Sequence, residues 1–216
     1  MKIAVLGTGI VGDAIGTKLV QCGHEVKMGS RTATNAKAAA WVMKNGIRAS
    51  QGTFADAASF GEIVFNCTHG RASLEALNLA GINNLKNKIL IDIANALDFS
   101  KGMPPSLVVC NTDSLGEQIQ RAFPDTKVIK TLNTMNCNLM VNPGLVANGD
   151  HDIFISGNDV EAKATVTKIL RDWFGWKSIV DLGDITNARA TEMLLPIWVR
   201  LYGKFQSPNF NFKIVR

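Results

Sequence analysis

The chain of 216 residues is long enough to bury one substantial hydrophobic core. Its composition of 46% hydrophobic and 19% charged residues, with only 6 Pro, is typical of a packed globular protein and excludes a disordered one. The Lys and Arg residues behind the net charge of +5 are dispersed rather than clustered, so we expect no nucleic-acid partner.

Strands and helices are predicted to alternate along residues 1–131. Apolar runs predict strands at 2–6, 25–29, 62–67, 88–93 and 127–131, and helical spacing of apolar residues predicts helices over 10–22, 35–44, 71–80 and 114–123. Strands separated by helices form a parallel sheet with right-handed crossovers. Ile89-Leu90-Ile91 shows no polar alternation, as expected of a strand covered on both faces. The pattern predicts an α/β fold with a Rossmann-type, doubly wound parallel sheet.

The C-terminal part, beyond residue 142, shows a different sequence pattern. We predict a strand at 152–156, a helix over about 159–175, and a last helix from about Asn187 that is kinked at Pro196.

Two domains are therefore expected: a dinucleotide-binding domain over residues 1–131, and a smaller C-terminal α/β subdomain over residues 132–216 that ends in a helix. The second would carry the acceptor site and the dimer contacts. Trp198 and the aromatic tail after it either bury against a second copy or cap the chain's own core, and periodicity does not separate the two. We expect a homodimer.

No targeting segment or metal site is predicted. The first residues run straight into glycine, and no apolar stretch reaches the roughly 20 residues that span a bilayer, so we expect a cytoplasmic protein outside the membrane. The cysteines lie far apart without zinc-site spacing; they are Cys22, Cys67, Cys110 and Cys137. In a reducing compartment they act as small hydrophobes. His24 and His151 stand in turn-like sequence and are expected to be solvated.

One motif lies between the first predicted strand and the first predicted helix. Gly7-Thr8-Gly9-Ile10-Val11-Gly12 has the pattern G-x-G-x-x-G. Gly7 permits the tight turn, Gly9 lets the backbone approach a pyrophosphate, and Gly12 allows the helix to pack closely on the strand. The helix N-terminus supplies amide donors and partial positive charge. In this context the motif predicts a dinucleotide site; the alternative is a glycine turn without a ligand.

The residues after the second predicted strand indicate which dinucleotide binds. An Asp or Glu about 20 residues beyond the glycines would accept the ribose hydroxyls of NAD, whereas this strand ends in Gly29-Ser30-Arg31-Thr32. Arg31 can pair with the 2′-phosphate of NADP in a bidentate fork, and Ser30 can donate to it. We predict NADP(H), with Lys37 adding positive charge from the next helix. The alternative is that Arg31 and Lys37 are merely solvated.

Several short segments resemble the NADPH-dependent deazaflavin (coenzyme F-420) reductase family. They are the opening GTGIVG, GSR at 29–31, KTLNTMN at 130–136, SGND at 156–159, EMLLP at 192–196 and FNFK at 210–213. The likeness covers essentially the whole chain, and the cytosolic domains of six-transmembrane epithelial metalloreductases are similar. It implies hydride transfer between NADP(H) and a deazaflavin or flavin-like ring, a small-molecule electron acceptor. Such a transfer needs placement more than an acid or base, so no catalytic residue is predicted.

The resemblance also implies two groups of contact residues. Those along the NADP chain and at the nicotinamide ribose are Thr68, His69, Ala94 and Asn95. Those beside the ring and its acceptor are Asn133, Thr134 and Met135. Archaeal members of the family carry His where this chain has Asn133, and Trp near the place of His69, so the acceptor side differs.

Two alternative functions stay open at this point. A dehydrogenase or imine reductase of small carbon substrates requires a proton donor near the nicotinamide; Lys130 and Asp92 are candidates, but both lie on or beside strands and are expected to be structural. A non-catalytic NADP-binding redox sensor is the other, because fold does not imply function. Cys67 and His69 can share a face, but no third ligand or orienting acid lies nearby in sequence.

Overall fold

A computed structural model of the protein describes residues 1–216. The strands of the main sheet are β1 (Lys2–Leu6), β2 (Glu25–Ser30), β3 (Ala49–Thr53), β4 (Ile63–Asn66), β5 (Ile89–Asp92), β8 (Lys127–Thr131), β9 (Asp152–Gly157) and β10 (Ser178–Asp181). Their order across the sheet is β10-β9-β8-β5-β4-β1-β2-β3. Every neighbouring pair is parallel except β8 and β9, which are antiparallel. The predicted α/β fold is confirmed, with one antiparallel pairing that the sequence did not predict.

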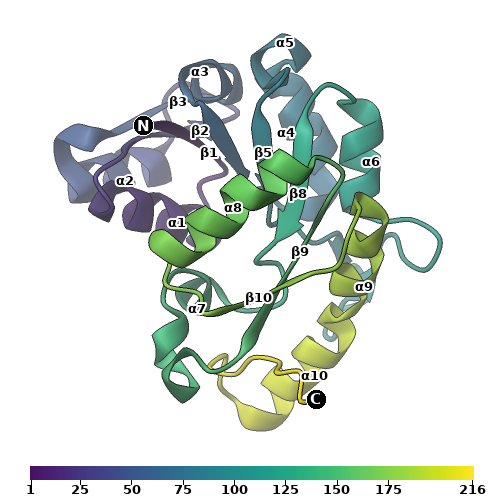
Figure 1. The fold of residues 1–216 in the computed structure, drawn as a ribbon. Helices are drawn as coiled ribbons and strands as arrows, with labels where there is room; N and C mark the ends of the chain where they lie inside the picture. The colour runs from purple at the N-terminus through teal and green to yellow at the C-terminus, as the bar shows by residue number, and fades with distance from the viewer.

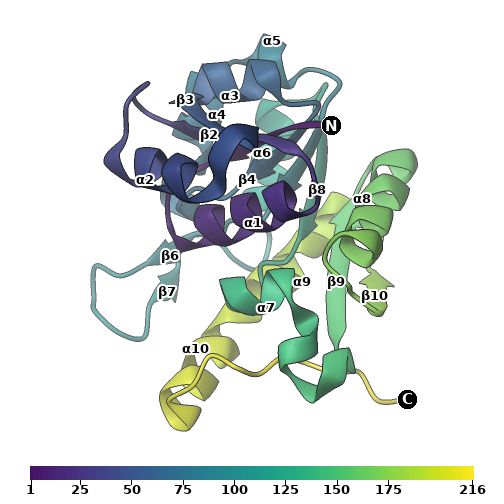
Figure 2. The same cartoon turned by 90° about the vertical axis from the view of Figure 1, so that its left-hand side faces the viewer.

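Helices cover both faces of this sheet (Figure 1). The helices are α1 (Ile10–Gln21), α2 (Ala36–Asn45), α3 (Phe54–Phe60), α4 (Ser73–Ala80), α5 (Ile82–Leu85), α6 (Leu115–Ala122), α7 (Cys137–Val141), α8 (Val160–Asp172), α9 (Ala188–Met193) and α10 (Leu195–Phe205). A short antiparallel hairpin, β6 (Leu97–Asp98) with β7 (Ser106–Leu107), projects from the body (Figure 2). None of the helices is long and apolar enough to cross a membrane.

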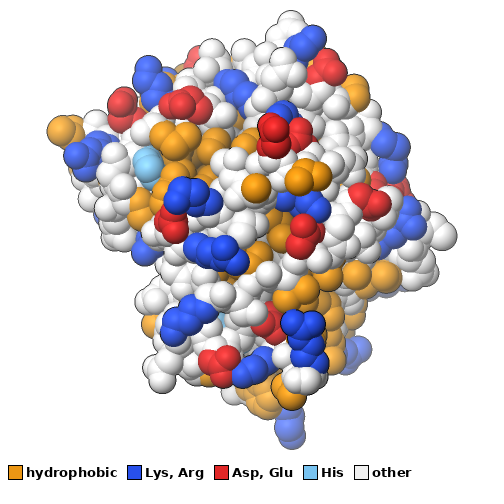
Figure 3. All heavy atoms as spheres, viewed as in Figure 1, with side chains coloured by type: hydrophobic (Ala, Val, Ile, Leu, Met, Phe, Trp, Pro, Cys, Tyr) orange, Lys and Arg blue, Asp and Glu red, His pale blue; other side chains and the backbone are white.

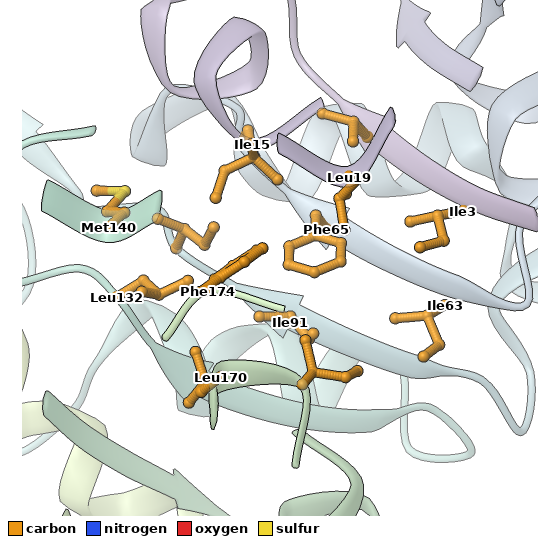
Figure 4. Packing of buried hydrophobic residues seen from close by; sticks show 14 of the residues in the cluster. Ile3, Ile15, Leu19, Ile63, Phe65, Ile91, Leu132, Met140, Leu170 and Phe174 are labelled. Carbon is orange, nitrogen blue, oxygen red and sulfur yellow. The ribbon is translucent and has the colours of Figure 1, made fainter. Parts of the chain in front are cut away.

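The alternation of side chains along each strand divides the core into two clusters. On β1, Ile3 and Val5 face the cluster under α1, α2, α7 and α8, while Ala4 and Leu6 face the one under α3, α4, α6 and α9. Phe65 of β4 lies at the centre of the first cluster, below α1 (Figure 4). Both faces of the sheet are therefore shielded from water, which explains why residues 3–6 of β1 and 63–65 of β4 are all apolar.

The C-terminal helical segment differs from the prediction. Instead of one helix kinked at Pro196, two helices meet at Leu194, and Pro196 lies in the first turn of α10. The ring of a proline inside a helix clashes with the carbonyl four residues earlier, whereas the first turn of a helix tolerates it. The single kinked helix was therefore wrong.

The last residues of the chain are held against the start of β9. The Asp152 amide donates to the Phe212 carbonyl over 3.0 Å, and Asn211 Nδ2 donates to His151 Nδ1 over 2.8 Å. His151 Nε2 donates in turn to the Pro143 carbonyl. The expectation that His151 is solvated was wrong, because its ring is buried and uses both nitrogens. His24 is half-buried and its ring lies against Trp173.

The predicted boundary at residue 131 stays a prediction. Strands β9 and β10 follow it in sequence and continue the same sheet through β8.

Phe65→Ala should lower the free energy of unfolding by about 3–5 kcal/mol, because the Phe65 side chain is fully buried and its removal leaves a cavity. Urea unfolding measures the change. Met43→Ala is the control: this side chain is 86% exposed, so the change should stay within about 0.5 kcal/mol. Equal midpoints for the two variants would contradict the assigned core.

Candidate active site

A cavity of about 560 Å³ opens where β1, β2 and β4 end. Residues that the sequence predicted for the cofactor line it: Gly7, Thr8, Gly9, Ser30, Arg31, Thr68 and His69. Its other walls include Phe54, Ala76 and Leu79. Ligands of open α/β sheets bind in the crevice outside the carboxyl ends of the strands, and this cavity occupies that place.

The three motif glycines have separate physical roles. Gly7 has a φ of +116°, and a Cβ added there would lie 2.5 Å from the Cys67 carbonyl oxygen. A Cβ on Gly12 would lie 2.1 Å from the carbonyl oxygen of Gly7. A Cβ on Gly9 would meet no protein atom within 4 Å. Gly7 and Gly12 are thus required by the fold, whereas Gly9 leaves the loop open toward a ligand.

The loop after β2 presents Arg31 at the cavity. Ser30 is buried, and its Oγ donates to the Thr32 carbonyl over 2.6 Å, which fixes the backbone on either side of Arg31. Arg31 itself is exposed and forms no ion pair with a carboxylate of the chain. Its guanidinium is therefore available to an anionic ligand.

Lys37 does not line the same cavity. With Ile10 it lines a second, more open hollow of about 1060 Å³, which runs along α1, α2 and α7 and meets the first cavity at Thr8 and Gly9. Val11 packs instead against the core. The structure thus brings Arg31 to the glycine loop but leaves Lys37 on the other side of that loop.

The predicted ribose and acceptor residues meet beyond the ends of β5 and β8. Asn95 Nδ2 donates to the Asn133 carbonyl over 2.7 Å, and Asn133 Nδ2 donates to Asn95 Oδ1 over 3.0 Å. A Cβ on Gly70 would lie 2.1 Å from the Asn95 carbonyl oxygen, so the loop after β4 also approaches here. Sequence analysis missed Gly70, because nothing local marks a close approach to a distant loop.

The segment 133–135 is buried rather than open. Asn133, Thr134 and Met135 are 2%, 2% and 6% exposed, and Met135 packs in the hydrophobic core. Asn136 caps α7 and donates to the Pro208 carbonyl, which ties the segment to the C-terminal tail. Neither of the two hollows described above is lined by the side chains of 133–135.

A buried ionic network lies directly behind this region. Lys130 Nζ is 2.8 Å from Asp92 Oδ2, 2.8 Å from Glu192 Oε1 and 2.5 Å from the Ala94 carbonyl oxygen. Burial alone would lower the pKa of Lys130, but the charges and hydrogen bonds of Asp92 and Glu192 hold it above its ordinary value. Sequence analysis expected Lys130 and Asp92 to be structural, but it missed Glu192.

The pair Cys67 and His69 forms no nucleophilic site. Burial raises the pKa of the Cys67 thiol well above its ordinary value, and the charge of Asp92 adds to the rise, so the thiolate is disfavoured. His69 lines the cavity, with its ring centroid 6.4 Å from that of Phe99 on the projecting hairpin. No group of three or more His, Cys, Asp or Glu side chains is arranged to hold a metal ion.

Comparison with known proteins gives the family. The family model described as "NADP oxidoreductase coenzyme F420-dependent" matches residues 2–96. A solved structure from Arthrobacter sp. FB24, provisionally described as an F420-dependent NADP reductase, is 53% identical with a TM-score of 0.95, and the match covers 100% of both chains. This chain belongs to the F420-dependent NADP oxidoreductase family. The predicted family is confirmed, and with it the class of NADP-dependent oxidoreductases.

This chain spans different shares of its more distant relatives. The F420-dependent NADP reductase of Methanocaldococcus jannaschii is 28% identical over 99% of this chain and 98% of that protein. Metalloreductase STEAP3 of Rattus norvegicus is 29% identical over 91% of this chain, which spans only 38% of its length. A reductive aminase from Aspergillus terreus, 20% identical with a TM-score of 0.66, shares the fold.

Gly9→Ala should fold like the wild type and bind NADPH about tenfold or more weakly, because the added methyl meets no protein atom and enters the open space above the loop. Titration calorimetry with NADPH and thermal unfolding measure the two quantities. Gly12→Ala is the matched change: its methyl collides with the Gly7 carbonyl, so it should cost at least about 1–3 kcal/mol of stability. Wild-type affinity in Gly9→Ala would contradict a phosphate-binding role for the loop.

Proposed function

We propose that this oxidoreductase transfers hydride between NADP(H) and a deazaflavin of the coenzyme F420 class. The observation that carries the proposal is the likeness over the full length of both chains to proteins named F420-dependent NADP reductases, which includes the C-terminal part beyond the nucleotide-binding motif. The chain spans these relatives almost completely, whereas it spans a minor part of the metalloreductase.

The glycine loop and the Arg31 cavity are proposed to hold the NADP chain. Phosphate oxygens would accept from amides at the start of α1, where Gly9 leaves room, and Arg31 and Ser30 would hold the 2′-phosphate. Thr68 and His69 line the same cavity. The cavity carries one acidic side chain, Glu75, on α4 rather than at the end of β2.

The nicotinamide and the acceptor are proposed to meet beside Asn95 and Asn133. Ala94 and Asn95 would contact the nicotinamide ribose, and the 133–135 segment would border the acceptor. The bound dinucleotide supplies the hydride, and the protein supplies orientation and exclusion of water. The reciprocal amide bonds between Asn95 and Asn133 support this role, because they fix the two loops relative to each other.

The imine-reductase alternative requires a proton donor near the nicotinamide, and neither of its two candidates, Lys130 and Asp92, fits that role. Lys130 and Asp92 are fully buried, and all three ammonium hydrogens of Lys130 have acceptors within the protein. Neither side chain reaches a substrate. Hydride transfer between two rings places no such demand on the protein, so the buried pair is compatible with the proposed reaction.

We also propose that the protein works in the cytoplasm as a homodimer, with residues 132–216 as the contact subdomain. All four cysteines are free thiols, which is compatible with a reducing compartment. Hydrophobic side chains gather over α10 in Figure 3, where Ile197, Tyr202 and Phe205 are exposed. Such a patch supports burial against a second copy.

Arg31→Ala should weaken NADPH binding about tenfold or more, near 1.4 kcal/mol, and leave NADH binding unchanged, because only NADPH carries the 2′-phosphate. Titrations followed by nicotinamide fluorescence measure both. Lys37→Ala is the control, since Lys37 lines the other hollow and should have the smaller effect. Equal affinity of the wild type for NADH and NADPH would overturn the assignment of the 2′-phosphate site.

The acceptor is tested by adding a deazaflavin, and separately an ordinary flavin, to protein saturated with NADPH. We expect NADPH absorbance to fall with the deazaflavin at a rate proportional to protein concentration. Tight NADPH binding without oxidation by either ring would favour the redox-sensor alternative and contradict the proposed reaction.

A further inference from the structure

The Lys130 network connects the C-terminal helices with the nicotinamide end of the proposed site. Glu192 lies on α9, and its two carboxylate oxygens accept from the backbone amides of Leu115 and Gly116 at the start of α6, over 2.9 and 3.1 Å. The same carboxylate contacts Lys130. Lys130 in turn donates to the carbonyl of Ala94.

The other end of the network reaches the wall of the cofactor cavity. Asp92 Oδ1 accepts from Asn66 Nδ2 over 2.8 Å, and Asn66 Oδ1 accepts from Thr68 Oγ1 over 2.6 Å. Thr68 lines the cavity. One chain of hydrogen bonds therefore runs from α9, behind the strand ends, to the residues that face the cofactor.

We propose that Lys130 and Glu192 are positioning residues, which hold the Ala94 carbonyl and thereby orient the Asn95 carboxamide at the nicotinamide. This inference rests on the proposed placement of the nicotinamide beside Asn95. Glu192 acts through Lys130, and Lys130 acts through the Ala94 backbone.

The location of the network argues for this role over stability alone. A buried ion pair is weak evidence of stability, since apolar residues of the same size often serve as well or better. Here a buried cation and two buried carboxylates meet at the carboxyl edge of the sheet, next to the loop that carries Asn95. The α6 amides offset the second carboxylate charge.

The effect should appear in the rate of hydride transfer more than in affinity. The proposed 2′-phosphate contacts are made by Arg31 and Ser30, and neither residue bonds to a member of the network. The direction of the Asn95 carboxamide depends on the Ala94 backbone before it and on Asn133 across from it. A misplacement of about 1 Å between reacting groups can cost about a hundredfold in rate.

Glu192→Gln keeps the size of the side chain and removes its charge. We expect its single-turnover rate of deazaflavin reduction by bound NADPH to fall about tenfold or more, with the NADPH dissociation constant within about twofold of the wild type. Glu117→Gln is the matched control, because Glu117 is also a buried carboxylate. It joins α6 to α9 by accepting from Arg189 Nε over 2.8 Å, and it has no contact with Lys130. Its rate should stay near that of the wild type.

A double-mutant cycle separates positioning from general destabilisation. If Glu192 acts through Asn95, Glu192→Gln should have little further effect on the rate in an Asn95→Ala background. Additive losses, or a wild-type rate in Glu192→Gln, would overturn the inference while leaving the proposed function intact. Wild-type protein that bound no NADPH would overturn both. If the wild type binds NADPH but reduces no deazaflavin, only the proposed function fails. The fluorescence emission of bound NADPH then tests the inference. We expect this emission to change in Glu192→Gln and to stay the same in Glu117→Gln.

Discussion

The close approach of α1 to the end of β1 is the constraint on which the rest of the site depends. A Cβ on Gly12 would overlap the carbonyl of Gly7, so only glycine lets the helix begin directly behind the strand. That approach aims the first amides of α1 at the crevice beyond the sheet. β2 and β4 flank β1 in register, so their loops, which carry Arg31 and Thr68, meet above the same amides.

Local signals were enough to predict the centre of the fold but not its edges. Inside the sheet, β1, β4 and β5 are apolar along most of their length, because helices cover both faces. The edge strand β3 contains Gln51 and Gly52, and β10 is only partly buried, so neither shows that signature. The short helix α3 was missed although Thr53 and Asp56 form a capping box, a signal that the sequence does contain.

The residues that line the proposed cofactor cavity could be predicted from local sequence, whereas the ionic network behind it could not, for a physical reason. The glycine motif and Arg31 lie within one βαβ unit, where spacing determines geometry. Lys130 on β8 and Glu192 on α9 are far apart in sequence, and the tertiary packing of the C-terminal helices brings them together. The one local hint was a lysine inside an otherwise apolar strand, since a buried lysine requires partners.

The proposed acceptor side is built around a pair of amide side chains, Asn95 and Asn133. Asn133 donates to Asn95 through its carboxamide and accepts from Asn95 through its backbone carbonyl. A carboxamide keeps its donor at every physiological pH, whereas an imidazole changes its charge near neutrality. The loops at the proposed nicotinamide are thus joined by neutral groups, and the charges lie one layer deeper, at Lys130, Asp92 and Glu192. Neutral groups at the proposed nicotinamide end, with the charges behind it, suit the proposed reaction, in which hydride passes directly between two rings and the protein transfers no proton.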